Sequence, residues 1–129
     1  MILVSGVVLA LLLGGCAARS HTKLAGGGIA PSNPHGEPVC LVRAPLPSSI
    51  EYTVIGEVKG GKRFYGSFSE VLAVMADEAR RVGADAVIAL KTETDVNAIA
   101  WARPVGNGKA IKLKDKSSFD CKQNGGTLY

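Results

Sequence analysis

The fold of this chain is decided by the stretch SFSEVLAVMADEARRVGADAVIAL, residues 67–90. Its first part has helical spacing, with apolar side chains on one face of residues 68–82. These apolar residues are Phe68, Val71, Leu72, Met75, Ala76, Ala79 and Val82. Ser67 and Glu70 form the capping-box pattern that opens a helix, and Gly83 is a typical C-terminal stop. The stretch therefore predicts one helix with an apolar face that needs a partner layer.

Strands are predicted on both sides of this helix. The apolar run that follows it suits a central strand, and other segments alternate apolar and polar residues. We expect strands at 40–42, 52–58, 86–90, 98–103 and 109–113, with 40–42 at an edge and Trp101 as the one large anchor. Glycine and proline predict turns at 60–61 and 104–108. The expected fold class is α+β, with one helix packed on a mostly antiparallel sheet of about four to five short strands.

The apolar opening segment ends in Leu13-Gly14-Gly15-Cys16 and resembles a bacterial lipoprotein signal with its lipobox. The resemblance implies that residues 1–15 are removed and that Cys16 carries acyl chains. An uncleaved membrane anchor and a buried core segment are the alternatives. Ala17 stands where inner-membrane retention signals usually have Asp, which favours the outer membrane, facing the periplasm. Because no Lys or Arg precedes the apolar segment, we expect the true start of translation to lie upstream of Met1.

Residues 16–38 are predicted to be a lipid anchor and flexible tether, and residues 39–125 the folded domain. The tether contains Gly26-Gly27-Gly28 and three prolines, with few large apolar residues to bury. A coil of this length spans about 25 Å and would let the domain stand off the membrane. His21 and His35 both lie in this segment, where we expect ordinary solvated side chains.

Three cysteines are present, and two remain when Cys16 is assigned to the anchor. In an oxidising periplasm, Cys40 and Cys121 most simply form one disulfide. A reactive or metal-binding pair is the alternative. The predicted bridge would connect the first strand of the domain to its irregular C-terminal segment.

The charge pattern points to an anionic partner or to a simple solvated surface. The formal net charge is +4, which favours anionic surfaces such as phospholipid, lipopolysaccharide or peptidoglycan. Lys62 and Arg63 lie in a predicted loop, and Lys109 and Lys112 in the last predicted strand, so these four are candidate contacts with an anionic partner. The strand lysines would also discourage edge-to-edge aggregation. Nucleic acid is the wrong partner for the expected compartment.

No set of residues predicts catalysis. Neither histidine lies in the predicted domain, so no serine there has a folded imidazole as its base. Glu93 and Asp95 lie two apart on one predicted strand, a pattern typical of solvated carboxylates. Asp85 follows the helix stop and is expected to bond local backbone amides. We therefore expect no enzyme activity, no cofactor and no metal.

Two motifs together resemble a known family. The strand ending Ile55-Gly56-Glu57-Val58 and the helix leading into Gly83-Ala84-Asp85-Ala86-Val87-Ile88 resemble the YbjQ-like heavy-metal-binding domains. They also resemble the outer-membrane lipoprotein that senses envelope stress for the Rcs phosphorelay. The resemblance covers roughly residues 50–113 and implies the α+β fold and a lipoprotein setting. The expected function is binding of envelope proteins, peptidoglycan or lipopolysaccharide, or stress sensing; a metal or small anionic ligand-binding module is the alternative.

Overall fold

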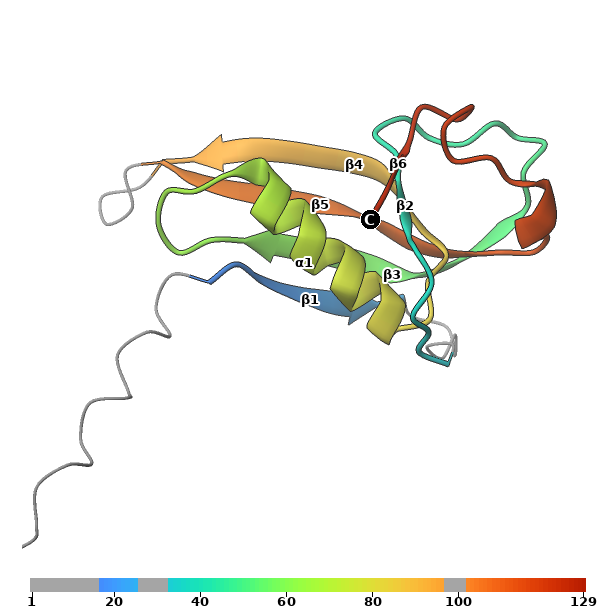
Figure 1. Ribbon diagram of the computed structural model, residues 1–129, viewed down its shortest axis with the longest axis horizontal. Coiled ribbons are helices and arrows are strands. Elements are labelled where there is room, and N and C mark those ends of the chain that lie inside the picture. Colours follow the sequence, from blue (N-terminus) through green and yellow to red (C-terminus); the bar gives the residue numbers. More distant parts are fainter. Residues whose placement is uncertain (1–16, 26–32, 97–101) are drawn as a thin grey trace, which may run out of the picture.

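A computed structural model of the chain describes residues 17–25, 33–96 and 102–129. Figure 1 shows α1 lying across one face of a single sheet. The elements are β1 (Arg19–Leu24), β2 (Cys40–Leu41), β3 (Tyr52–Gly61), α1 (Phe68–Arg81), β4 (Ala86–Asp95), β5 (Arg103–Leu113), a 3-10 turn (Lys116–Ser118) and β6 (Thr127–Leu128). The sheet order is β1-β3-β5-β4-β2-β6, and β2 pairs parallel with β4 while the other pairings are antiparallel. The α+β prediction is confirmed, with six strands in the described residues where four to five were expected.

The helix begins and ends where the sequence predicts. Ser67 accepts a hydrogen bond from the Glu70 amide, and the Glu70 carboxylate accepts one from the Ser67 amide, which completes the capping box. Gly83, with φ of 78°, has the left-handed conformation that follows many helix ends. The apolar face of α1 is buried against the sheet through Val71, Met75, Ala76 and Ala79.

The charged residues of α1 pair at a spacing of three residues. Arg80 contacts Asp77, and Arg81 contacts Glu78. Glu78 is buried on the side of the helix that faces β1, where the Thr22 hydroxyl donates to its carboxylate at 2.7 Å. The Glu78 carboxylate therefore connects the last turn of α1 to β1.

The glycines expected to turn the chain lie instead inside strands. Gly60 and Gly106 face each other across β3 and β5 beneath α1. A Cβ added at Gly60 would lie 2.6 Å from Met75 Cγ, and one at Gly106 would lie 2.9 Å from its sulfur. The predicted turns at 60–61 and 104–108 are therefore wrong, because these glycines make room for Met75. Trp101 and most of the predicted strand 98–103 lie outside the described residues.

A bulge in β4 changes which way its second half faces. Ala89 has φ of 51°, and the register with β5 shifts between Ile88 and Lys91. Val87 and Leu90 therefore both join the core beneath α1, although an odd spacing would place them on opposite faces of a regular strand. The bulge thus turns Lys91 to the face away from the helix.

Two described parts of the segment expected to be a flexible tether pack on the domain. Residues 19–24 form β1, which pairs along the length of β3, and the Ser20 hydroxyl donates to the Lys59 carbonyl. His35 is half-buried: its amide donates to the Arg80 carbonyl, and its ring Nε2 lies 2.6 Å from the Ala84 carbonyl oxygen. The predicted tether of 16–38 is wrong over these residues, since RSHTKL alternates like a strand but has only one apolar side chain, Leu24, to indicate it.

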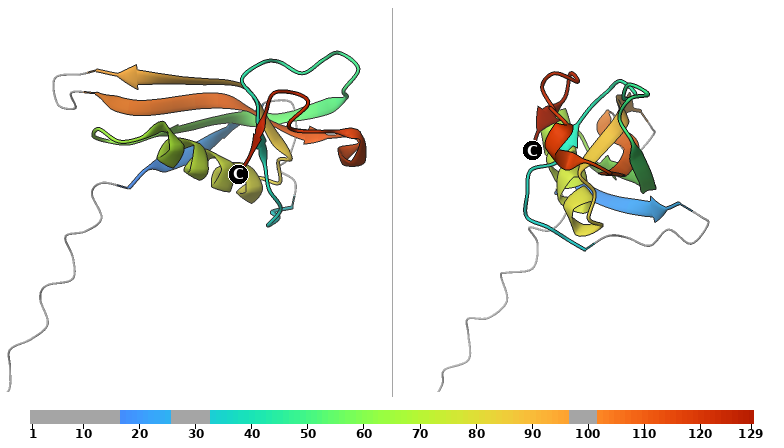
Figure 2. Two further views of the ribbon diagram at one scale, coloured as in Figure 1. Left: turned by 45° about the horizontal axis from the view of Figure 1, so that its top comes forward. Right: turned by 90° about the vertical axis from the view of Figure 1, so that its right-hand side faces the viewer.

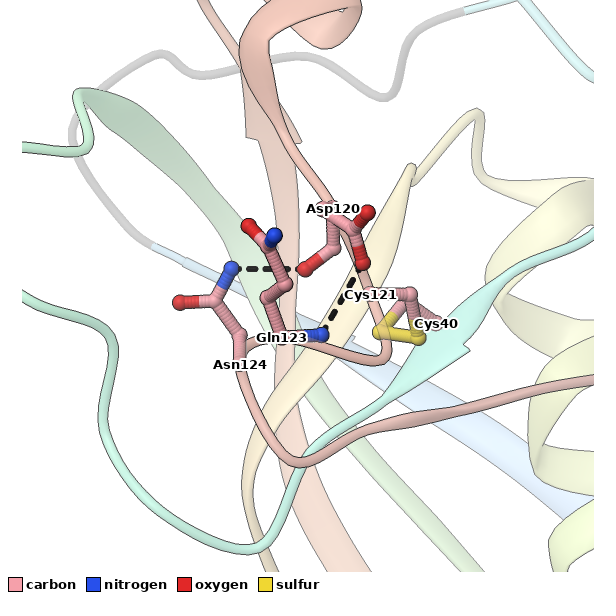
Figure 3. Close-up of a disulfide and its surroundings, with 5 residues drawn as sticks. All are labelled: Cys40, Asp120, Cys121, Gln123 and Asn124. Atoms are coloured by element: carbon pink, nitrogen blue, oxygen red, sulfur yellow. Dashed lines mark hydrogen bonds between the residues drawn. A yellow bond between two sulfur atoms is a disulfide. The ribbon is translucent and has the colours of Figure 1, made fainter.

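Opposite α1, half of the sheet is covered by a second apolar cluster. The loops 43–51 and 114–126 bring Leu46, Ile50 and Phe119 over Ile88 and Ile111. The predicted disulfide between Cys40 and Cys121 is confirmed, with an S–S distance of 2.08 Å, and lies in this cluster (Figure 3).

The C-terminal segment continues from this disulfide into the sheet. Asp120 closes the following turn by accepting from the Gln123 amide at 2.9 Å and, through its carbonyl, from the Asn124 side chain at 2.7 Å (Figure 3). Strand β6 then pairs with β2, which is therefore an inner strand and not the predicted edge. Val39 and Tyr129 exchange backbone hydrogen bonds, so the domain extends to Tyr129 and not to 125.

Candidate anion-binding groove

The sheet face opposite α1 is open at the end that the second cluster leaves uncovered. Because side chains alternate along a strand, every second residue of β1, β3, β5 and β4 points to this face. In the open half these positions carry mostly polar and charged side chains. They form the walls of a groove of about 800 Å³, whose lining includes residues of all four strands.

One row of residues crosses the floor of the groove. His21 pairs with Lys59, Lys59 with Asn107, and Asn107 with Lys91 in the strand register. Neighbouring strands lie about 4.8 Å apart, so the row spans about 14 Å. It presents an imidazole, an amide and two ammonium groups, all of which donate hydrogen bonds to oxygen atoms.

The groove has a positive balance of charge. Its lining contains six basic residues, Arg19, Lys59, Lys62, Arg63, Lys91 and Arg103. Against them stand two carboxylates, Glu93 and Asp95. Such an excess of positive charge attracts anionic groups, and the attraction weakens as the salt concentration rises.

Some of these cations are already paired and others are not. Arg103 contacts Asp95 at 2.7 Å, and Lys59 lies 3.9 Å from Glu57. In the described residues, Arg19, Arg63 and Lys91 form no ion pair. Among the residues that the structure describes, these three therefore supply charge that a ligand can use without breaking an ion pair.

Lys62 is held by the first turn of α1. Its ammonium contacts the Glu70 carboxylate at 2.9 Å, and its side chain is only 11% exposed. This hydrogen bond, with a second from the Ser67 amide, holds the pKa of Glu70 below its ordinary value. Lys62 thus anchors the loop before the helix and contributes less free charge than its sequence position suggests.

The structure brings together only part of the predicted contact set. Lys62 and Arg63 both line the groove. Lys109 lies on the same sheet face, opposite Glu57 and Ile88, outside the groove lining. Lys112, three residues further along β5, points to the other face. Because β5 lies between β3 and β4, these two lysines protect no sheet edge.

Lys112 belongs to a separate cluster around Asp85. The Asp85 carboxylate is buried, accepts from the Leu113 amide at 2.9 Å, and lies 3.9 Å from Lys112 and 3.6 Å from Lys116. The amide that Asp85 binds lies 28 residues away in sequence, so the expected hydrogen bond to a local backbone amide is wrong. Lys116 also contacts Glu37, and this hydrogen bond lowers the pKa of Glu37 and raises that of Lys116. The cluster joins the residues before β2 to the C-terminal segment.

Sequence reasoning missed Arg19, His21, Lys59, Lys91 and Arg103 as groove residues. Basic side chains at 19, 21 and 23 alternate with small polar ones, which is the signal of a strand with one cationic face. Lys91 gave no comparable signal, because its direction depends on the bulge at Ala89. Cys16, the predicted lipidation site, lies outside the described residues.

In the described part of the chain, no three His, Cys, Asp or Glu residues are grouped so that they could hold a metal ion. Over the same residues, no helix is long and apolar enough to cross a membrane. The carboxylates Glu93 and Asp95 line the groove, and Arg103 contacts Asp95.

No protein-family model, curated protein sequence or solved structure matches this chain. The likeness to YbjQ-like domains and to the Rcs sensor stays a prediction from short motifs. What the protein binds has to be argued from the groove itself.

Proposed function

We propose that this protein is an outer-membrane lipoprotein whose periplasmic domain binds anionic components of the cell envelope without catalysing a reaction. The lipobox-like ending at Cys16 supports the acyl anchor, and a Cys40–Cys121 disulfide suits an oxidising compartment. The observation that carries the binding role is a row of hydrogen-bond donors across four strands, in a groove lined by six basic residues. Binding at this row would suit a sensor of envelope stress.

The shape of the groove favours a partner with several spaced anionic groups. A row of about 14 Å can contact more than one phosphate or carboxylate at once. Phosphorylated lipopolysaccharide and the carboxylates of peptidoglycan peptides both have this character. An open polar groove can also contact an extended polymer along its length, because the polymer does not have to fit inside a closed pocket.

A small anionic ligand is the second candidate. The groove volume of about 800 Å³ lies within the range of small-molecule sites. A molecule with two or three acidic groups would satisfy Lys59, Lys91 and Arg19 together. Envelope polymer and small ligand use the same residues, so a binding experiment with both kinds of probe separates them.

The test compares two exposed lysines of equal charge. Lys91 lies in the groove, and Lys122 lies in the exposed turn after Cys121. Acylated protein carrying Lys91→Glu or Lys122→Glu would be incubated with isolated peptidoglycan, with lipopolysaccharide and with a panel of small phosphates and carboxylates. We expect Lys91→Glu to weaken retention on at least one polymer by about tenfold, and Lys122→Glu to leave it unchanged.

Three results bear on the proposal. Retention on polymer that falls with salt and with Lys91→Glu supports an envelope partner. Thermal stabilisation by a small acid, without retention on polymer, supports the second candidate. Equal losses in Lys91→Glu and Lys122→Glu would show that binding depends on net charge alone, and the groove would have no binding role.

A further inference from the structure

The loop between β3 and α1 exposes aromatic side chains beside basic ones. Tyr65 is 81% exposed, Phe64 is 37% exposed, and Phe68 follows at the first position of α1 with 39%. The Arg63 guanidinium lies 5.6 Å from the centre of the Phe64 ring. Amphipathic aromatic rings next to cations are the composition that proteins place at the boundary between lipid headgroups and acyl chains.

This loop lies at the same end of the molecule as the start of β1. Figure 1 and the left panel of Figure 2 both place the 62–67 loop beside the beginning of β1 and the end of β4. The strand register agrees, since Arg19 pairs with Gly61, the residue before the loop. Val96, which follows β4 at this end, is 70% exposed.

The proposed acyl anchor is joined directly to this end. Cys16 precedes Ala17, and Ala17 lines the groove beside Arg19. Consecutive Cα atoms are about 3.8 Å apart, so acyl chains on Cys16 would enter the bilayer within a few ångströms of the domain. With β1 already paired at residue 19, no long tether remains to lift this end from the membrane.

From these positions we infer that the end formed by residues 17–19 and 62–68 docks on the anionic phospholipid surface in which the Cys16 acyl chains insert. Tyr65 and Phe64 enter the headgroup layer, and Arg63, beside Phe64, faces the phosphates. This inference rests on the proposed acylation of Cys16. The acyl chains hold the protein at the bilayer, and the contacts of this end fix how the domain stands on the membrane.

Docking at this end has a geometric consequence that can be measured. Tyr52 begins β3, and Gly61 ends it next to the loop. At about 3.3 Å per residue these two ends lie about 30 Å apart. A domain docked end-on therefore keeps Tyr52 in water while Tyr65 touches lipid, although both are exposed tyrosines.

The experiment uses the acylated full-length mature protein, with acylation confirmed by mass. Tyr65→Trp and Tyr52→Trp are each made in a Trp101→Phe background and reconstituted into phosphatidylcholine–phosphatidylglycerol vesicles that contain brominated lipid. We expect the bromines to quench about half of the fluorescence of the tryptophan at 65 and almost none at 52, because the quencher lies within the acyl region. Arg63→Glu should reduce the quenching at 65, whereas Lys122→Glu should not.

Equal quenching at the two positions would overturn the inference. Absence of quenching at position 65 would also overturn it. Tyr65 is 81% exposed, so we expect its replacement to leave the core unchanged. Circular dichroism of each variant checks that it is folded. Retention of the protein on envelope polymer, with and without Lys91→Glu, is measured on the same preparations. A domain that retains polymer but shows no quenching at 65 would refute membrane docking while leaving the proposed function standing.

Discussion

Removing the disulfide with Cys40→Ala and Cys121→Ala tests how much of the stability depends on this one bridge. The two cysteines are separated by 81 residues, and they join β2 to the segment that leads to β6. On the chain-entropy model, closing a loop of this length lowers the entropy of the unfolded chain enough to contribute about 4.5 kcal/mol. Net stabilities of small domains are about 5 to 15 kcal/mol, so the bridge supplies a large share.

The assay is urea unfolding followed by circular dichroism, on the oxidised protein and on the double alanine variant. With a urea dependence of about 1.5 kcal/mol per M, we expect the midpoint to fall by about 3 M, or the variant to be unfolded without urea. Because both sulfurs are buried against Gly126 and Val42, a small packing loss adds to the entropic one. A loss below about 1 kcal/mol would refute the reasoning and show that the unfolded chain already keeps these segments together.

Four further variants test other features of the fold by the same unfolding assay. Asp85→Ala should cost about 1 to 3 kcal/mol because the Leu113 amide loses its buried acceptor, and Asp85→Asn, which keeps an acceptor, should cost less; equal costs would contradict this. Ala89→Gly should be neutral or stabilising, since glycine relieves the positive φ of 51°, and a loss of more than about 1 kcal/mol would disprove strain there. The lowered pKa of Glu70 means that its pairing with Lys62 stabilises the fold above the ordinary glutamate pKa of 4.5 and is lost as pH falls through the lower folded value. The stability difference between the wild type and Glu70→Gln should therefore shrink from neutral pH to about pH 2, and a constant difference would argue against it.

The helix and the inner strands were predictable because their signals are local. The capping box at Ser67, the apolar face of 68–82 and the stop at Gly83 all act within a few residues of one another. The run 86–90 is apolar because its residues enter the apolar clusters on both faces of the sheet. The disulfide was predicted from the cysteine count and the expected compartment, without knowledge of the pairing of strands.

The candidate groove could not be predicted in the same way. It needs β1, whose six residues contain one apolar side chain and which is a strand only because β3 offers an unpaired edge. Lys91 faces the groove only because Ala89 forms a bulge, and Gly60 and Gly106 lie in strands because Met75 needs their space.

The sequence by itself determined the helix, its buried face, the central strand and the cysteine pair, because hydrophobic periodicity and capping are short-range properties of the chain. Only the tertiary structure decided the strand order, the parallel pairing of β2 with β4 and the direction of each basic side chain. These depend on hydrogen bonds and close packing between residues distant in sequence, and a shift of one residue in a strand reverses the face on which its charges lie.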